Sequence, residues 1–269
     1  MEPKKELTTD NEQFSSCLDN EILVIREKRH IFDLTWDVQD IFSLYDYIDS
    51  VLSSGAYKAL VMFARSEQNL HIEHRRFLSK ILSGIWESPN WESLNLDRFL
   101  NVVNKLILTL STLNRMTIFA GQGTVSLFYL NIGLAYDYRI VAEDTVFENL
   151  NLDIGLVTKG SGYFLPRLLG IRKATEVLQQ KSFSAEEAFQ LGLVDLIVPV
   201  SRLEEETMQF VSENQALLSS TLLDIRKLFK CDIKELVRRL ELEDNLIKER
   251  LKSEEFRRTF AASRENSGG

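Results

Sequence analysis

The sequence predicts an α/β protein, and three observations carry this prediction. The stretches "KALVMFA" (58–64) and "RMTIFAGQG" (115–123) contain apolar runs of strand length, typical of strands buried on both faces. Strand-like and helix-like stretches alternate along the first two thirds of the chain, which favours βαβ crossovers. From 201 onward the sequence is charged and has helical periodicity. We therefore expect a mixed sheet followed by a helical region.

The elements are predicted in order along the chain. "EILVIREKRHIFDLTW" (21–36) reads as two short strands, and 38–54 has helical spacing of its apolar residues. The stretch from 67 to 98 is polar and rich in aromatic residues, and we expect a loop with short helices there. A helix is predicted over 95–114, with Asn95 or Asp97 near its N-cap.

The second half of the chain continues this pattern. A glycine turn at 121–123 leads into an apolar helix over 126–137, and two strand pieces follow within 138–148. Further helices are predicted after the glycine turn within 160–170, over 171–180 and over 184–195, the last of them opened by a capping box between Ser184 and Glu187. "LIVPV" (196–200) is a short strand. We divide the chain into a mobile tail (1–20), a core (21–200), a helical region (201–262) and a second mobile tail (263–269).

Composition limits the classes of function. Hydrophobic residues make up 44% of the 269 residues and charged residues 27%, as in an ordinary soluble domain. The formal net charge of −8 argues against nucleic acid as a partner. It also means that an anionic ligand would need basic residues gathered locally. No apolar run approaches the ~18 residues of a membrane helix, and we expect no membrane partner.

The cysteines point to a reducing compartment. Cys17 and Cys231 form no CxxC or metal-ligand pattern. The first twenty residues lack the apolar core of a signal peptide. We therefore expect a cytoplasmic protein with two reduced thiols and no metal.

Four stretches of the sequence resemble the crotonase (enoyl-CoA hydratase/isomerase) superfamily. They are "TIFAGQGTV" (117–125), "GLAYDYRIVAEDTVFE" (133–148), "LPRLLGIRKATEVLQQKSFSAEEAFQLGLVDLIVP" (165–199) and "ERLKSEEFRRTFAA" (249–262). The resemblance implies a crotonase-like spiral of ββα units with a C-terminal helical region used to form a trimer or a dimer of trimers. It also implies a coenzyme A thioester as ligand and no other cofactor.

The family polarises the thioester carbonyl with two backbone N–H groups, which stabilise negative charge on its oxygen. The resemblance places the second donor at Phe128, where the family has glycine, and the first donor at His71. The two glutamates that hydratases use for acid–base catalysis fall on Asn131 and Asn151. A carboxamide has no proton that titrates near neutrality and cannot replace them in that role.

Other polar residues are candidates for roles at such a site. Asp153, Glu148 and His71 can act as a relocated acid or base. The basic candidates for coenzyme A phosphates are Arg65, Arg75, Arg76 and Lys159. Solvated surface charge is the alternative explanation for each of these four, and Asn131 and Asn151 can equally fill the cavities of lost acids.

Three functions remain open from the sequence. The first is a divergent family member that binds an acyl-CoA-like ligand without ordinary hydratase activity. The second is an active isomerase or lyase with relocated acid–base residues. The third is a structural partner of an active paralogue, joined through C-terminal helices. For those helices we expect burial, against the core or a neighbour, of Leu236, Leu240, Leu246, Leu251 and Phe256.

Overall fold

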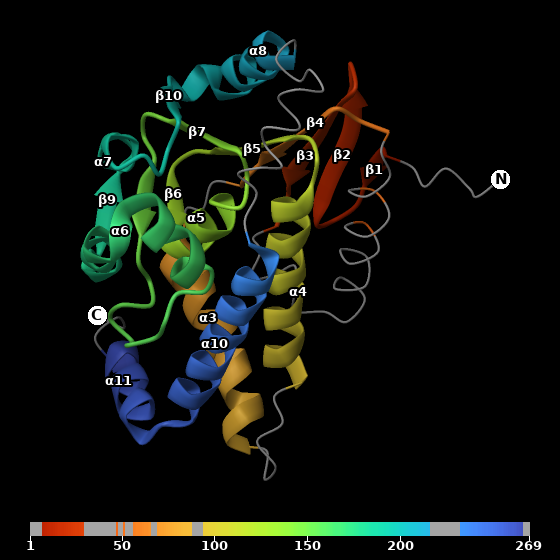
Figure 1. Cartoon of the computed structure of the whole chain (residues 1–269). Coiled ribbons are helices and arrows are strands. Elements are labelled where there is room, and N and C mark those ends of the chain that lie inside the picture. The colour runs from red at the N-terminus through yellow and green to blue at the C-terminus, as the bar shows by residue number, and fades with distance from the viewer. Residues whose placement is uncertain are drawn as a thin grey trace, which may run out of the picture.

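The computed structural model describes residues 7–29, 47, 51, 56–65, 69–87, 94–215 and 232–265. Its main element is a seven-stranded sheet with the order β1-β2-β3-β4-β5-β7-β10 (Figure 1). The bounds are β1 Thr9–Asp10, β2 Phe14–Asp19, β3 Ile22–Glu27, β4 Ala59–Phe63, β5 Met116–Gly121, β7 Tyr138–Ala142 and β10 Leu196–Val198. The pairs from β3 to β10 are parallel, while β1–β2 and β2–β3 are antiparallel. The fold is the α/β arrangement predicted.

A second sheet and the helices complete the core. The small sheet has the order β6-β8-β9, formed by Thr124–Ser126, Val146–Glu148 and Ser182–Ser184. The helices are α3 Leu70–Glu87, α4 Leu94–Thr112, α5 Leu127–Gly133, α6 Ser161–Gln179, α7 Ala185–Gln190, α8 Leu203–Gln215, α10 Ile233–Lys252 and α11 Glu254–Glu265, with a 3₁₀ turn at Val200–Arg202. Among the described residues, none of the helices has the length and apolar content needed to cross a bilayer.

Both faces of the main sheet are buried, which explains the continuous apolar runs of its strands. In β4, Leu60 joins the larger apolar cluster, while Ala59 and Val61 join the smaller one on the opposite face. Helix α8 covers the smaller cluster through Val211. The larger cluster includes residues of α3, α4, α5, α6 and α10. The side chains of the candidate site come mostly from this larger cluster.

Three expectations from the sequence need correction. Strands β1 and β2 lie inside the predicted mobile tail 1–20, and Phe14 of β2 is buried with 3% of its surface exposed. The stretch predicted as a loop with short helices contains the 18-residue helix α3. Helix α4 begins at Leu94, so Asp97 lies in its first turn and is not a cap. The predicted helix over 38–54 lies outside the described residues, except for Tyr47 and Val51.

The C-terminal helices pack on the core of their own chain, with α10 against α4 and α6. The expected burial holds for Leu236, Leu240, Leu251 and Phe256, but Leu246 is 42% exposed. The capping box of α7 is present: the Ser184 hydroxyl accepts from the Glu187 N–H, and the Glu187 carboxylate accepts from the Ser184 N–H. The predicted tail 263–269 begins within α11, and 266–269 lie outside the described residues.

Candidate active site

A small apolar cavity lies beside the first turn of α5. The volume of this cavity is about 50 Å³. Helices α3, α4 and α10 line it together with the segments around Asn149–Asn151 and Leu156–Lys159. The cavity thus lies where the resemblance to crotonases places the thioester.

Phe128 occupies the predicted oxyanion position at this cavity. Ser126 caps α5 by accepting a hydrogen bond from the Tyr129 N–H over 3.1 Å. Phe128 is therefore in the first helical turn, where backbone N–H groups point along the axis and favour negative charge. Its ring stacks on Phe99 at a centroid distance of 5.7 Å and lines the cavity. The first turn of α5 thus lies at the cavity, with the aromatic side chain of Phe128 beside it.

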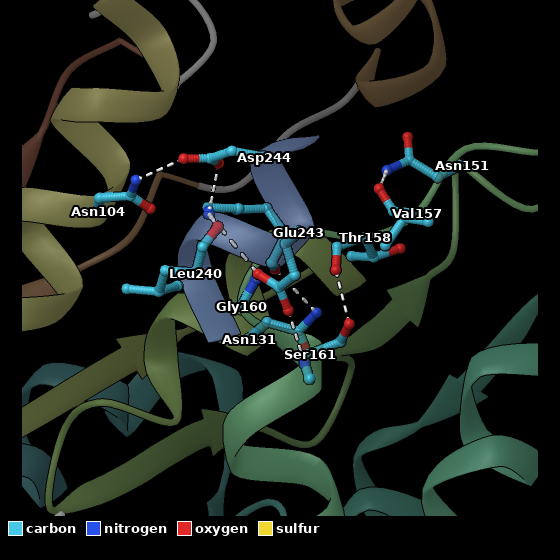
Figure 2. Close-up of polar contacts among 12 residues, drawn as sticks. Asn104, Asn131, Asn151, Val157, Thr158, Gly160, Ser161, Leu240, Glu243 and Asp244 are labelled. Atoms are coloured by element: carbon cyan, nitrogen blue, oxygen red, sulfur yellow. Dashed lines mark hydrogen bonds and ion pairs between the residues drawn. The ribbon is translucent and has the colours of Figure 1, made fainter. Parts of the chain in front are cut away.

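Asn131 is in the same helix but does not line the cavity. It is fully buried, and its Nδ2 donates to the carbonyl oxygen of Lys159 over 3.2 Å (Figure 2). Its Oδ1 is buried without a hydrogen-bond partner. A Cβ added at Gly160, whose φ is +82°, would lie 3.2 Å from the Cβ of Asn131. The side chain is packed against the turn before α6.

Asn151 does line the cavity, and His74 holds its side chain. His74 Nε2 and Asn151 Oδ1 are 2.9 Å apart, and Asn151 Nδ2 is 3.4 Å from the carbonyl oxygen of Val157. Burial lowers the pKa of His74 to about 4, although the hydrogen bond to Asn151 opposes this shift. The imidazole is therefore neutral at pH 7 and donates its Nε2–H to the amide oxygen. Because the amide oxygen accepts this bond, the amide N–H₂ is the side-chain group of Asn151 that can donate to a ligand.

A second, polar pocket of about 190 Å³ lies on the other side of His74. The lining includes His71, Arg75, Glu148, Asp153 and Lys181. His71 Nε2 is 2.8 Å from Glu148 Oε2, an ion-pair distance. The two groups are not aligned as a hydrogen bond, because this buried carboxylate oxygen has no hydrogen-bond partner. The structure thus brings an imidazole and a carboxylate together outside the apolar cavity.

Asp153 is placed at the outer edge of this pocket. Its carboxylate is 2.8 Å from Lys181 Nζ, and the two side chains are 64% and 75% exposed. Such an exposed ion pair is worth about 0–1 kcal/mol. Asp153 does not line the apolar cavity, so the fold does not bring it to the ligand position next to Phe128.

The four basic residues predicted as candidates for contact with coenzyme A phosphates differ in their surroundings. Arg65 donates to the carbonyl oxygen of Lys28, and its backbone N–H is 3.4 Å from Glu27 Oε2. Arg75 is half-buried in the polar pocket and has no ion-pair partner within the described ranges. Arg76 is exposed. Of the four, Arg75 has the geometry of a cation that can receive an anionic group.

Lys159 is the candidate that the structure excludes from contact with a phosphate. It is only 2% exposed, and its Nζ lies 2.6 Å from Asp244 Oδ1, 2.7 Å from the carbonyl oxygen of Leu240 and 3.7 Å from Glu243 Oε2. Asp244 also accepts from Asn104 Nδ2 (Figure 2). The ammonium group is surrounded by partners from α10, and it is not accessible to a phosphate of a ligand.

Glu243 attaches the charge cluster of Lys159, Glu243 and Asp244 to the N-terminus of α6. Its carboxylate accepts from the N–H groups of Gly160 and Gly162 at 2.7 and 2.6 Å, at the N-terminus of α6. Burial raises the pKa of Glu243 and lowers that of Lys159, and the attraction between them opposes both shifts. α10 is thereby attached to the turn that Asn131 packs against. The sequence offered no local signal for this cluster, because its members are about 80 residues apart.

The described residues that line the apolar cavity include no aspartate or glutamate. The same part of the chain contains no group of three or more side chains that can hold a metal ion. What the cavity offers chemically is a helix N-terminus, the amide of Asn151 and apolar walls. His74 was missed as the partner of Asn151, although its position three residues after His71 was visible in the sequence.

Comparisons with known proteins agree on one family. The family model for enoyl-CoA hydratase/isomerase matches residues 95–267. A trans-2-decenoyl-[acyl-carrier-protein] isomerase of Streptococcus mutans is 28% identical over 120 residues, which are 44% of this chain and 46% of that protein. The match therefore spans about half the length of that curated relative.

Solved structures agree in fold. The enoyl-CoA hydratase of Bacillus halodurans superposes with a TM-score of 0.75 at 21% identity, covering 93% of this chain and 99% of that one. An enoyl-CoA hydratase of Mycobacterium avium subsp. paratuberculosis gives a TM-score of 0.70 at 18% identity, with 94% and 96% covered. HypX of Aquifex aeolicus gives 0.72 at 17%, with 96% of this chain and 46% of that one. On the family match and this fold, the chain belongs to the enoyl-CoA hydratase/isomerase family.

Proposed function

We propose that this chain binds an acyl thioester at the apolar cavity and does not act as an ordinary hydratase. One observation carries the proposal: the first turn of α5 meets an apolar cavity, and no carboxylate among the described residues lines it. The first turn of α5 supports the binding of a thioester oxygen. Within the described part of the chain, the carboxylates that would move protons during hydration are absent from the cavity wall.

The chemistry of hydration explains the second half of the proposal. Addition of water to an enoyl thioester needs a base for the water and an acid for the α-carbon, and each typically contributes about 10²–10⁴ in rate. Asn131 does not line the cavity, and its amide donates to the carbonyl oxygen of Lys159. Asn151 is a neutral amide held by His74. The amide of Asn151 can donate to an oxygen in the cavity, and neither carboxamide supports proton transfer.

The carrier of the acyl group is a pantetheine thioester in either of two forms. The family model names enoyl-CoA, and the relative in Streptococcus mutans is named for an acyl-carrier-protein substrate. In a chain with a net charge of −8, an anionic carrier needs local cations. Arg75, which is half-buried, and Arg65 are the candidates for this contact.

The test measures binding and turnover separately. Calorimetric titration with coenzyme A, crotonyl-CoA and crotonyl-acyl carrier protein is expected to give binding of at least one carrier form. The enoyl absorbance of crotonyl-CoA is expected to stay constant under the same conditions. Absence of binding at millimolar coenzyme A and with the carrier protein would refute the ligand, and steady loss of the absorbance would refute the missing hydratase activity.

A second candidate function is favoured by the pair of His71 and Glu148. An imidazole 2.8 Å from a carboxylate can serve as an acid–base unit, and isomerisation of a double bond needs one group that removes and returns a proton. The test is turnover of 2-enoyl or 3-enoyl thioesters. Loss of this turnover in both His71→Gln and Glu148→Gln would favour isomerisation over binding alone. Unchanged turnover in both variants would exclude this pair.

A further inference from the structure

The acyl cavity is small, and its size restricts the ligand. One water molecule needs about 10–15 Å³ of the volume open to its centre. The cavity of about 50 Å³ therefore has space for roughly four non-hydrogen atoms. We infer that the protein selects short acyl groups of about two to four carbons, an inference that rests on the proposed binding of an acyl thioester.

Three aromatic rings, each in contact with the next, form one wall of the cavity. Phe77 contacts Phe99 at a centroid distance of 4.7 Å, and Phe99 stacks on Phe128 at 5.7 Å with 30° between the ring planes. All three side chains are at least nine-tenths buried. Because interiors are packed at crystal-like density, these rings have little room to move aside. Phe128 stands next to the predicted thioester position and therefore limits the acyl group most directly.

Helix α10 forms another wall of the cavity. Ile247 and Leu251 of α10 line the cavity, and they are 6% and 1% exposed. The cluster of Lys159, Glu243 and Asp244 fixes α10 only one turn before Ile247. This wall cannot yield to a longer chain without separating buried charges, so it is a firm boundary.

The third boundary separates the cavity from the polar pocket. His74, Leu78, Asn149 and Leu150 line both spaces. A longer acyl chain that crossed this boundary would break the bond between His74 and Asn151 and would enter a pocket lined by Arg75 and Glu148. Apolar carbon gains nothing from such surroundings. These three boundaries therefore oppose the extension of an octanoyl chain within the cavity.

The experiment compares acetyl-, butyryl- and octanoyl-CoA by calorimetry with the wild-type chain and with Phe128→Ala. We expect butyryl-CoA to bind at least about tenfold more tightly than octanoyl-CoA to the wild type, because overpacking by several methylene groups opposes the longer chain. Phe128→Ala is expected to bring the two dissociation constants within about threefold of each other. Equal affinities for both esters in the wild type would overturn the size limit.

Two controls make the outcomes distinct. Phe183→Leu changes another buried, stacked phenylalanine, which pairs with Phe147 and does not line the cavity. It is expected to keep the wild-type preference, and a loss of preference in this variant would show that the effect is not local. If coenzyme A, all three esters and crotonyl-acyl carrier protein fail to bind, the proposed function itself fails. If they bind without a preference for short chains, only the inference about size fails.

Should Phe128→Ala not fold, Phe99→Leu tests the same wall from α4. This variant retains an apolar side chain and opens the cavity at the ring that contacts both Phe77 and Phe128. The expected result is tighter binding of octanoyl-CoA with little change for acetyl-CoA. Unchanged binding of octanoyl-CoA would contradict the assignment of this wall.

Discussion

The imidazole of His74 holds the carboxamide of Asn151, with 2.9 Å between Nε2 and Oδ1. Because burial lowers the pKa of His74 to about 4, the ring donates its proton to the amide oxygen at pH 7. Asn151, where the resemblance to crotonases predicts a catalytic position, is thus a neutral amide held in place. His74 lines both the apolar cavity and the polar pocket.

The first prediction follows from the titration of His74. Its pKa is about 4 in the folded protein and 6.5 for an ordinary solvated histidine, so the unfolded chain binds more protons between these values. The contribution of His74 to the free energy of unfolding is about 3 kcal/mol. It is fully present above pH 6.5 and is lost as the pH falls toward 4. His74→Gln is expected to flatten this part of the stability curve in urea unfolding measured from pH 7 to 4.

His71→Gln is the matched control for this measurement. The substitution is the same and lies on the same helix, but His71 is 66% exposed. Because His74 is intact in this variant, its stability curve is expected to keep the slope that His74→Gln loses. Equal slopes for His74→Gln and the wild type would show that His74 is not buried as a neutral ring.

The second prediction concerns the buried cation of Lys159. Lys159→Met leaves Glu243 and Asp244 buried without their counter-charge, which costs about 3–5 kcal/mol. The free energy of unfolding from urea titration measures this loss. Lys181→Met breaks an ion pair of the same type with Asp153 at the surface and is expected to cost about 0–1 kcal/mol. Similar losses in the two variants would contradict the buried cluster.

The third prediction separates the two asparagines. In Asn131→Glu, a carboxylate would meet the carbonyl oxygen of Lys159 in a fully buried site, and we expect destabilisation of more than about 1–3 kcal/mol. Asn151 is half-buried, and Asn151→Glu places a carboxylate next to His74, so a smaller loss is expected. Urea unfolding gives the free energy of unfolding of each variant. A larger loss for Asn151→Glu than for Asn131→Glu would contradict the burial assigned to the two side chains.

The same two substitutions test whether hydratase activity can be restored. Neither variant, nor the double variant, is expected to hydrate crotonyl-CoA, because Asn131 does not line the cavity and Phe128 would remain beside the thioester. The assay follows the enoyl absorbance. Hydration by the double variant would show that Phe128 does not obstruct a productive thioester.

The fourth prediction concerns assembly, for which we propose a trimer on the basis of the family resemblance. Leu242 and Leu246 lie one turn apart on α10 and are 48% and 42% exposed in the single chain. Leu242→Glu combined with Leu246→Glu is expected to lower the molar mass in light scattering from that of an oligomer to that of a monomer of 31.0 kDa. A wild-type mass of 31.0 kDa at micromolar concentration would refute the assembly.

Much of the fold could be predicted because its signals are local. The strands around Leu60 and Ile118 are continuous apolar runs, and the capping box of Ser184 and Glu187 is a four-residue pattern. Helix α3 was missed because charged and aromatic residues obscure its buried face. That face has the helical spacing of His74, Phe77, Leu78, Ile81, Leu82 and Ile85. Strand β2 was missed because Ser16 takes an inward position where an apolar residue is the usual signal.

The candidate site was predictable only in part. The resemblance predicted site roles for Phe128 and Asn151. Both residues line the apolar cavity, and their roles stay predictions. It also placed Lys159 among ligands for phosphate, which is wrong because α10 surrounds the ammonium group. Partners that are 85 residues apart leave no pattern in a sequence window. Such contacts can be read only from tertiary structure.

The bond between Lys159 and Asp244 also has a consequence for synthesis of the protein. At about 5–20 residues per second, the ribosome needs roughly 4 to 17 s to add the 85 residues that separate them. During that time the lysine has no counter-charge, and Leu251 is not yet available to close the cavity. The nascent chain therefore becomes competent for a ligand only when its last long helix has left the exit tunnel and docked. A stalled or shortened chain would expose this unfinished core to chaperones and proteases.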